Sequence, residues 1–231
     1  MKKGIFFILT LLIIACSKKE NDLIVKATIV GLKKGTVYLK KMEDTLLITV
    51  DSLQIVGNSS FELQSNIESP ELFFLDLDNK SNDKHRITFF ADKGVTVINT
   101  TLKNVVFDAK IKGSKQQDLF QEYQTMISKM NNRNLDLIKE QFEAQKSSDT
   151  NKLNTIKKET DNSIKRKYLY TVNFALNNND SEVAPYLALA EIYNANLKYL
   201  DTINNALTPK VKASKYGKAL DKYIKSIREN N

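Results

Sequence analysis

The sequence predicts an α+β protein, in which an N-terminal antiparallel β-sandwich-like domain is followed by a helical region. Between residues 23 and 112, short β-branched or alternating segments recur, and turn residues such as Gly31, Gly57 and Asn58 separate them. From Gly113 onward, apolar residues recur at helical spacing instead. Two long amphipathic segments joined by a short polar turn further predict an antiparallel helix hairpin.

The same change of spacing divides the chain of 231 residues. We expect a lipoprotein signal peptide at residues 1–15, a lipidated N-terminus with a short linker at 16–22, a β-rich domain at 23–112 and a helical domain at 113–231. The 216 residues that would remain after cleavage allow one large domain or two modest ones.

The first residues have the order of a secretory signal. Lys2 and Lys3 precede ten uncharged residues at positions 5–14, a run too short to span a bilayer, which takes about 20. Ala15 then precedes Cys16, and this pattern resembles a lipobox. We therefore expect Cys16 to be lipidated and the mature chain to be held at a membrane by lipid. The alternatives are an uncleaved anchor helix and a plain secretory signal with a chance cysteine.

Cys16 is the only cysteine, so its lipidation would leave no free thiol. Disulfides, thiol redox chemistry, Cys-His catalysis and zinc ribbons would then be excluded in the mature protein. Without residues 1–15 the chain has 33 basic against 27 acidic residues, a net charge of +6. We read this excess as a solvated surface and expect no nucleic-acid partner; attraction to anionic lipid headgroups stays open.

The β-rich part is expected to contain seven or eight strands in a sandwich or open barrel. The predicted strands cover residues 23–30, 36–41, 46–52, 60–64, 71–77, 86–91, 95–99 and 105–111. Phe73 with Phe74, and Phe89 with Phe90, occupy adjacent positions in two of them. Because neighbouring strand residues point to opposite faces, one of each pair should enter the core, while the other lines a contact surface or meets the helices.

The helical part begins after Ser114, a candidate N-cap. Its first apolar stripe is predicted at Leu119, Tyr123, Met126, Met130, Leu135, Ile138 and Phe142. After a break at residues 147–149, the second stripe is predicted at Leu153, Ile156, Thr160, Ile164, Tyr168 and Val172. Three shorter helices follow: a buried one at 183–190 with Pro185 in its first turn, one at 197–207 stopped by Pro209, and one with Tyr216, Leu220, Tyr223 and Ile227.

The order of several short motifs is similar to that of a known family. These motifs are VKATIVGL (25–32), GTVYLK (35–40), Asp51 with Ser52, SPEL (69–72), KGSKQQD (112–118), SEVAPYL (181–187) and SKYGK (214–218). Together they resemble the N-terminal domain of unknown function that precedes thioredoxin-like thiol-disulfide interchange domains in Bacteroidota envelope lipoproteins. The resemblance spans nearly all of the predicted mature chain.

In the longer relatives, a thioredoxin fold with a Cys-x-x-Cys motif follows the stretch that matches residues 214–227. Here the sequence stops at Asn231, so we expect a stand-alone copy of the accessory region, and no residue inherits the family's redox activity. The resemblance also bears on location. Lys18 and Lys19 dilute the acidic run that often marks surface export in the family. We therefore expect an outer-membrane lipoprotein facing the periplasm, with surface exposure as the alternative.

The candidate chemical groups favour structural roles. His85 is the single histidine, in a polar loop without a nucleophile or an orienting partner. The run from Asp76 to Ser81 fails as a calcium loop, because Lys80 and Ser81 occupy its fifth and sixth positions; a strand end with two exposed acids fits better.

Several other charged groups also read as ordinary surface features. Glu43, Asp44 and Asp92 are expected in turns, and residues 165–167 on a solvated helix face. We assign no catalytic, cofactor-binding or metal-binding residue, and we predict no cofactor.

These observations predict a lipid-anchored envelope protein with a non-catalytic binding or scaffolding role. It would bind another envelope protein or a ligand. The alternative is an envelope enzyme, either a hydrolase or a redox component, whose site the sequence does not reveal. A further alternative is that it pairs with a separately encoded thioredoxin-like protein and restores the longer arrangement in trans.

Overall fold

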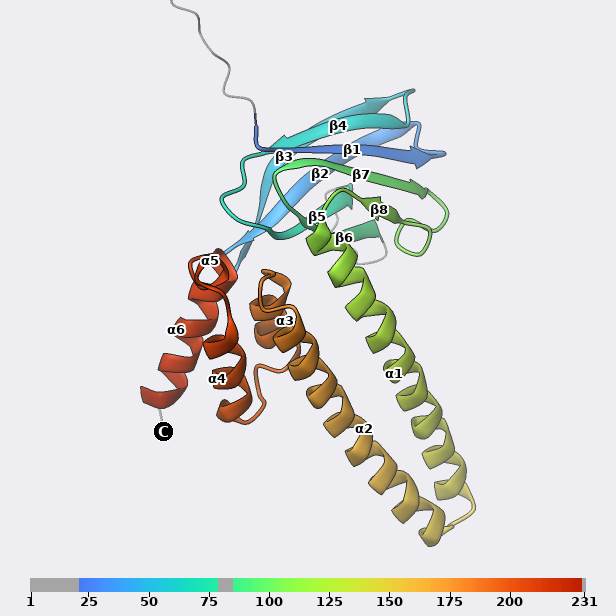
Figure 1. Ribbon diagram of the computed structural model, residues 1–231. Helices are drawn as coiled ribbons and strands as arrows, with labels where there is room; N and C mark the ends of the chain where they lie inside the picture. The colour runs from blue at the N-terminus through green and yellow to red at the C-terminus, as the bar shows by residue number, and fades with distance from the viewer. Residues whose placement is uncertain (1–20, 79–84, 230–231) are drawn as a thin grey trace, which may run out of the picture.

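The computed structural model describes residues 21–78 and 85–229, in which two four-stranded sheets are followed by helices (Figure 1). The α+β prediction is confirmed. The strands are β1 (Leu23–Val30), β2 (Lys34–Glu43), β3 (Leu46–Val56), β4 (Ser60–Ser65), β5 (Glu71–Leu77), β6 (Arg86–Ala91), β7 (Gly94–Thr101) and β8 (Lys110–Lys112). The helices are α1 (Lys115–Lys146), α2 (Thr150–Asn177), α3 (Val183–Glu191), α4 (Leu197–Ala206), α5 (Pro209–Lys212) and α6 (Lys215–Glu229).

The two sheets form a sandwich. Sheet A has the order β4-β1-β7-β8, and sheet B has the order β3-β2-β5-β6. The prediction of antiparallel strands requires one correction, because β1 and β7 are parallel, with Leu23 opposite Gly94 and Val30 opposite Thr101. The intervening strands β2 to β6 supply the long connection that parallel neighbours require.

The adjacent phenylalanines divide between two cores. Phe73 and Phe89 lie inside the sandwich, where their rings stack with centroids 6.1 Å apart. Phe90 is fully buried on the opposite face of sheet B, where it meets the helices, and Phe74 is partly buried in the same place. The predicted division of each pair is confirmed, with the helices as the second contact. Strand β5 is buried along almost its whole length because both its faces are covered.

Helices α1 and α2 form the predicted hairpin, which extends away from the rest of the molecule (Figure 1). Ser114 is the N-cap of α1, and its Oγ accepts a hydrogen bond from the Gln117 amide at 3.1 Å. Asp149 caps α2 in the same way through the Lys152 amide. Near the tip, a small apolar cluster of Leu137, Ala144, Leu153 and Ile156 joins the two helices.

The predicted apolar stripe of α1 is wrong at most positions beyond Tyr123, although Met130 packs against the cluster that contains Phe90, as predicted. Leu135, Ile138 and Phe142 are 49–63% exposed, and Met126 is exposed as well. The buried face instead contains Ile127, Leu137 and Ala144. Apolar residues occur on two faces of this helix, and α2 covers only one of them. On α2, Ile164 is likewise exposed, while Ile156 and Val172 are buried as predicted.

The last predicted strand, at 105–111, is also wrong over most of its length. Residues 103–108 form turns, and β8 contains only three residues. Two threonines hold this turn: Thr100 Oγ1 donates to the Val105 carbonyl at 2.7 Å, and Thr101 Oγ1 donates to Asp108 Oδ2 at 2.6 Å. These local side-chain bonds favour the turn over a ladder, although Val105 still reaches the sandwich core.

The short helices pack as predicted. Helix α3 is buried almost all round and has Pro185 in its first turn, while Pro209 opens α5 instead of only ending the helix before it. Helix α6 approaches the end of α5 so closely that a Cβ on Gly217 would lie 2.0 Å from the Val211 carbonyl oxygen. Only glycine fits at this contact, which fixes where α6 begins.

Candidate functional site

An aromatic cluster joins the sandwich to the helices. Phe90 on β6 lies 5.7 Å from Phe120 of α1, 5.6 Å from Tyr186 of α3 and 5.9 Å from Tyr216 of α6, measured between ring centroids. These are the tilted and edge-on contacts that aromatic rings prefer. Sheet B therefore shares one buried core with α1, α3 and α6, and Phe174 of α2 belongs to the same cluster.

The tyrosine hydroxyls of this cluster stay protonated at neutral pH. Burial raises the pKa of Tyr186 to about 12 and raises the pKa of Tyr216 further. Tyr216 Oη accepts a hydrogen bond from the Leu72 amide at 3.1 Å. Helix α6 is thus bonded to the first residues of β5 at the edge of the aromatic cluster.

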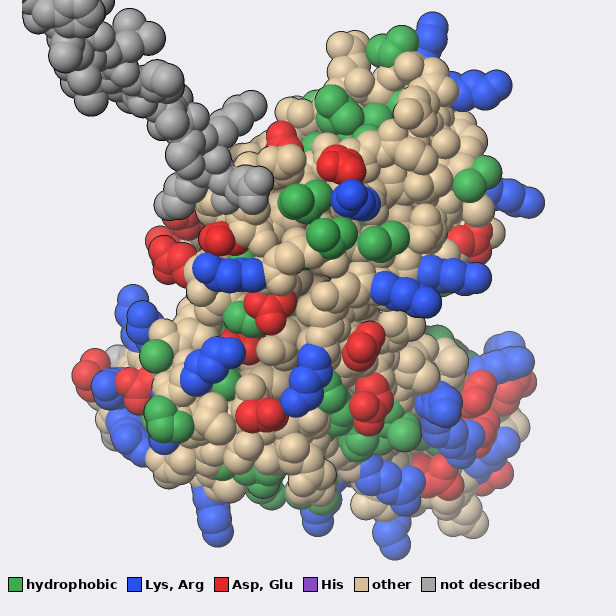
Figure 2. All heavy atoms as spheres, turned by 45° about the horizontal axis from the view of Figure 1, so that its top comes forward, with side chains coloured by type: hydrophobic (Ala, Val, Ile, Leu, Met, Phe, Trp, Pro, Cys, Tyr) green, Lys and Arg blue, Asp and Glu red, His purple; other side chains and the backbone are tan. Residues whose placement is uncertain are grey.

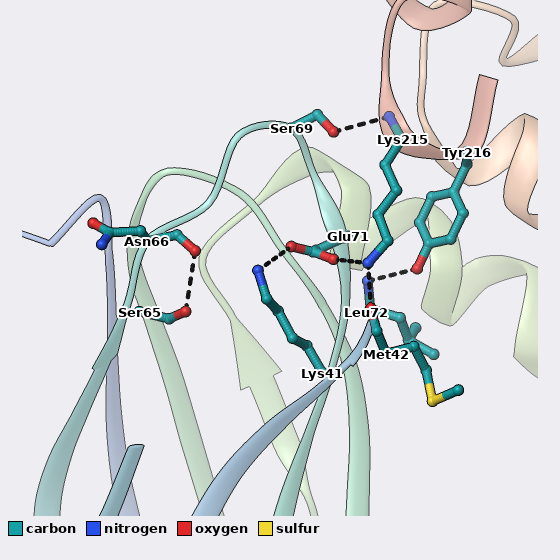
Figure 3. A network of polar contacts seen from close by, with 9 residues as sticks. All are labelled: Lys41, Met42, Ser65, Asn66, Ser69, Glu71, Leu72, Lys215 and Tyr216. Atoms are coloured by element: carbon teal, nitrogen blue, oxygen red, sulfur yellow. Dashed lines mark hydrogen bonds and ion pairs between the residues drawn. The ribbon is translucent and has the colours of Figure 1, made fainter. Parts of the chain in front are cut away.

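Beside Tyr216, a buried carboxylate ties the two parts together with charge (Figure 3). Glu71 begins β5, and its side chain is almost completely buried. One of its oxygens lies 3.1 Å from Lys41 Nζ of β2, and the other is ion-paired with Lys215 Nζ of α6. Lys215 also donates to the Met42 carbonyl, and its amide donates to Ser69 Oγ at 3.2 Å. One lysine therefore links α6 to both β2 and the start of β5.

Two of the motifs noted in the sequence face each other here. Residues 69–72 contribute the Ser69 hydroxyl, the Glu71 carboxylate and the Leu72 amide, and residues 214–217 contribute their three partners. Ser214 stabilises the start of the second motif, because its Oγ donates to the Val211 carbonyl and accepts from the Gly217 amide. Both motifs serve to dock α6 onto the sandwich.

A second pair of motifs meets on the other side of the aromatic cluster. Gln116 Nε2 donates to Glu182 Oε2 at 2.9 Å, and Ser181 is hydrogen-bonded to the Gln116 side-chain oxygen. The next residue, Gln117, accepts the Phe90 amide at 2.8 Å. Burial raises the pKa of the Glu182 carboxyl, and the nearby charges of Asp92 and Asp180 also raise it, while its own backbone amide and Lys210 act in the opposite direction.

Next to the Glu71 network lies a surface hollow of about 760 Å³, which we call the junction cavity. Its walls come from the end of β2 and the following turn, from the segment before β5, and from the end of α5 and the start of α6. The residues lining it are Asp22, Lys41, Met42, Glu43, Asp44, Asn66, Ile67, Glu68, Ser69, Glu71, Ala213, Lys215 and Lys218. Because Glu71 pairs with Lys41 and Lys215, the other charged groups on the wall are four carboxylates and Lys218.

The structure locates several residues that the sequence singled out. Cys16 lies outside the described residues. His85 is exposed, next to positions 79–84, which also lie outside them. Glu43 is the last residue of β2 and not part of the turn, whereas Asp44 lies in the following turn as predicted. Both line the junction cavity, and Asp92 accepts a hydrogen bond from the next amide in its own turn.

Asp76 corrects the prediction of two exposed acids at the end of β5. Only Asp78 is exposed, whereas Asp76 is buried between Lys40 at 2.9 Å and Arg86 at 2.7 Å. Burial acts to raise the pKa of Asp76, but the hydrogen bonds from Arg86 and Lys40 outweigh it and lower that pKa. The run at 165–167 is solvated as predicted except for Lys167, which pairs with Glu191 at 2.8 Å.

Residues 23–120 match the family model described as a domain of unknown function (DUF4369). The matched region covers the whole sandwich and continues eight residues past position 112, the predicted end of the β-rich domain. It ends at Phe120, which contacts Phe90. No curated protein and no solved structure matches the chain.

The boundary of the DUF4369 region crosses the junction. This region supplies Lys41, Glu71 and Gln116, whereas Glu182 and Lys215 come from the helices beyond it. All of these residues except Lys41 lie within the short motifs of the sequence, but nothing in the spacing of the motifs shows that residues 144 positions apart touch. Within the described ranges, no helix is both long and apolar enough to cross a membrane.

Proposed function

We propose that this protein is a lipid-anchored, non-catalytic binding module of the cell envelope, and that the junction cavity is its contact site for a partner protein. The observation that carries the proposal is the construction of this cavity. Its walls come from both structural parts, and the buried Glu71 pairs hold those walls together. A partner bound here would contact the DUF4369 region and α6 at once.

The chemistry of the cavity suits a polar protein segment. Glu71 is already ion-paired with both Lys41 and Lys215, so these two lysines act as structural cations. Asp22, Glu43, Asp44 and Glu68 remain along the rim, together with Lys218. Such a rim offers hydrogen bonds and charge contacts, which define register and specificity at an interface more than they add affinity.

The buried groups with raised pKa values at the junction support a structural role for the interior. Glu182, Tyr186 and Tyr216 are held inside the junction between the two parts, and none of them lines the cavity. A hydrolase or redox component, the enzymatic alternative, would instead place its perturbed groups where a substrate reaches them.

The lipid anchor is tested by the mass of the protein recovered from the membrane fraction. We expect residues 1–15 to be absent and Cys16 to carry a diacylglycerol thioether, and a Cys16→Ala variant should lose the lipid mass. A wild-type protein that keeps residues 1–15 and carries no lipid would contradict the anchor.

The contact site is tested by photocrosslinking in cells that express the anchored chain. A photoreactive residue at Glu68 or Lys218 on the cavity rim should capture a defined partner, while one at Lys129, exposed on α1, should not. The family resemblance leads us to expect a separately encoded thioredoxin-like protein among the products. The same products from all three positions, or none from the rim, would overturn the cavity as the contact site.

A further inference from the structure

The outer face of sheet A carries an unusual mixture of side chains for a surface that no helix covers. In Figure 1 the helices lie on the side of the sandwich away from this face, and Figure 2 brings it forward, with hydrophobic side chains between lysines. Ile24 lies opposite Val95, and Lys26 lies opposite Val97. Val95 and Val97 are 43% and 36% exposed, so this face is partly apolar.

A phenylalanine stands at the rim of the same face. Phe107 is 93% exposed, although its turn is held on both sides, by Val105 in the sandwich core and by Asp108 bound to Thr101. Phe107 lines a shallow hollow together with Asn99 and Lys110, which places it on the outer side of β7 and β8. The fold therefore presents this ring to solvent from a braced turn.

The charges on this face have a positive excess. They are Lys26, Lys110 and Lys112 against two acids: Glu62, which is 3.1 Å from Lys26, and Asp108, which lines the hollow beside Phe107 and accepts a hydrogen bond from Thr101. Within residues 21–78 and 85–229, no salt bridge involves Lys110 or Lys112. We call Ile24, Lys26, Val95, Val97, Phe107, Lys110 and Lys112 together the sheet A surface.

We propose that the sheet A surface lies against an anionic lipid surface, with the Phe107 ring inserted at the level of the headgroups. Lysine stems cover apolar surface while their ammonium groups reach anionic headgroups, and an aromatic ring gains most at that interface. Isolated valines between lysines match the boundary between headgroups and acyl chains better than they match a dry protein interface.

The position of the predicted anchor fits this orientation, which rests on the proposed lipidation. Cys16 precedes Leu23 by seven residues, a reach of about 24 Å at full extension. Leu23 is the first residue of β1, at the end of sheet A where Ile24 and Val95 lie. A lipid at Cys16 would therefore keep this sheet close to the membrane, and the two contacts would reinforce each other.

The chain has no tryptophan, which allows a direct test. The full chain carrying Phe107→Trp is incorporated into vesicles of equal parts phosphatidylcholine and phosphatidylglycerol with brominated acyl chains. We expect a blue shift of its emission and quenching by the bromine. The matched control is Phe142→Trp, at an exposed aromatic position far along the α1–α2 hairpin, which should show neither. Replacing both Lys110 and Lys112 by glutamine, or using phosphatidylcholine alone, should reduce the quenching.

The outcomes separate this proposal from the anchor. Flotation with vesicles but no shift for Phe107→Trp overturns the sheet A surface and leaves the anchor standing. A shift in protein that mass spectrometry shows to be unlipidated supports the surface and overturns the anchor. Equal quenching of both probes, or no flotation, overturns the sheet A surface.

Discussion

Tyr216 shows how one residue can join two parts of a molecule. Its ring packs against Phe90 and Tyr186, while its hydroxyl accepts the Leu72 amide. That amide belongs to the second residue of β5, a strand that is buried along almost its whole length, and is two positions after Pro70. Loss of the hydroxyl would therefore leave a buried donor without its partner, which costs more than the net value of the hydrogen bond itself.

We expect Tyr216→Phe to lower the free energy of unfolding by about 1–3 kcal/mol, measured by urea denaturation. The control is Tyr223→Phe on the same helix, whose hydroxyl donates to the Tyr193 carbonyl at an exposed site. This control should change stability by less than about 0.5 kcal/mol. If the two variants lose equal amounts of unfolding free energy, the hydrogen bond from the Leu72 amide would contribute no more to stability than the exposed one.

Glu182 should make stability depend on pH in the opposite sense to an ion-paired acid. Because the folded pKa is raised above the ordinary value of 4.5, the folded state binds more protons, and stability falls as pH rises from 4.5 through the folded pKa. We expect Glu182→Gln, which can still accept from Gln116, to flatten this decline. The check is the difference between the wild-type and variant denaturation midpoints from about pH 5 to pH 8. If the difference between the two midpoints does not change over that pH range, the raised pKa of Glu182 would be contradicted.

Asp76 acts in a separate window with the opposite sign. Its folded pKa lies below the ordinary 3.8, so its stabilising effect is present above that pH and is lost as pH falls through the folded pKa. The two carboxyls therefore do not mask each other in the experiment on Glu182.

The individual contacts of the junction could not be derived from the sequence, and the reason is physical. Glu71 and Lys215 are both common surface residue types, and only the folded chain brings them together across 144 positions. By contrast, Ser114 was predictable as a cap because its partner, Gln117, is three residues away. A hydrogen bond between residues that are close in the sequence can be predicted from their spacing. The buried ion pairs cannot, because they form only when the whole topology brings their partners together.

At the scale of elements, the hairpin shows both the strength and the weakness of periodic patterns. The two helices, their break and the second stripe apart from Ile164 were predictable, because amphipathic spacing persists over many turns. The face that packs was not, since Leu137 and Ile138 are equally apolar neighbours and only one is covered by α2. Similarly, β-branched residues at 105 and 106 indicated a strand, but the hydroxyls of Thr100 and Thr101 stabilise a turn there.

Which face of α1 packs against α2 can be tested by substituting Leu137 and Ile138 separately. Leu137 is buried in the cluster that closes the hairpin, so Leu137→Ala should cost about 2–4 kcal/mol of local stability. Ile138→Ala should cost less than about 0.5 kcal/mol. Hydrogen exchange of amides in the distal halves of α1 and α2 measures both. A larger loss of hydrogen-exchange protection in the Ile138 variant than in the Leu137 variant would mean that the predicted apolar stripe, and not the face with Leu137, packs against α2.

At the scale of the whole molecule, Phe90 should couple the helices to the sandwich. Phe90→Ala removes a ring that contacts α1, α3 and α6, and it should lower the free energy of unfolding by about 3–5 kcal/mol. It should also reduce the hydrogen-exchange protection of α3 and α6 more than that of β1 and β7. The control is Phe89→Ala, which removes the adjacent ring inside the sandwich. This variant should reduce the hydrogen-exchange protection of β1 and β7 more than that of α3 and α6. The same order in both variants would mean that the two parts are not coupled through Phe90.

The parallel pairing of β1 with β7 also has a consequence for the order of events during synthesis. Among the described strands, β1 is the first to leave the ribosome or a membrane channel, yet its parallel neighbour ends 71 residues after it, at Thr101. Until then, one edge of a strongly apolar strand has no native partner. Contacts of such long sequence separation slow folding and leave exposed edges prone to mispairing. Assembly of the sandwich therefore has to wait for most of its own sequence, and a factor that holds the nascent N-terminus would act during this interval.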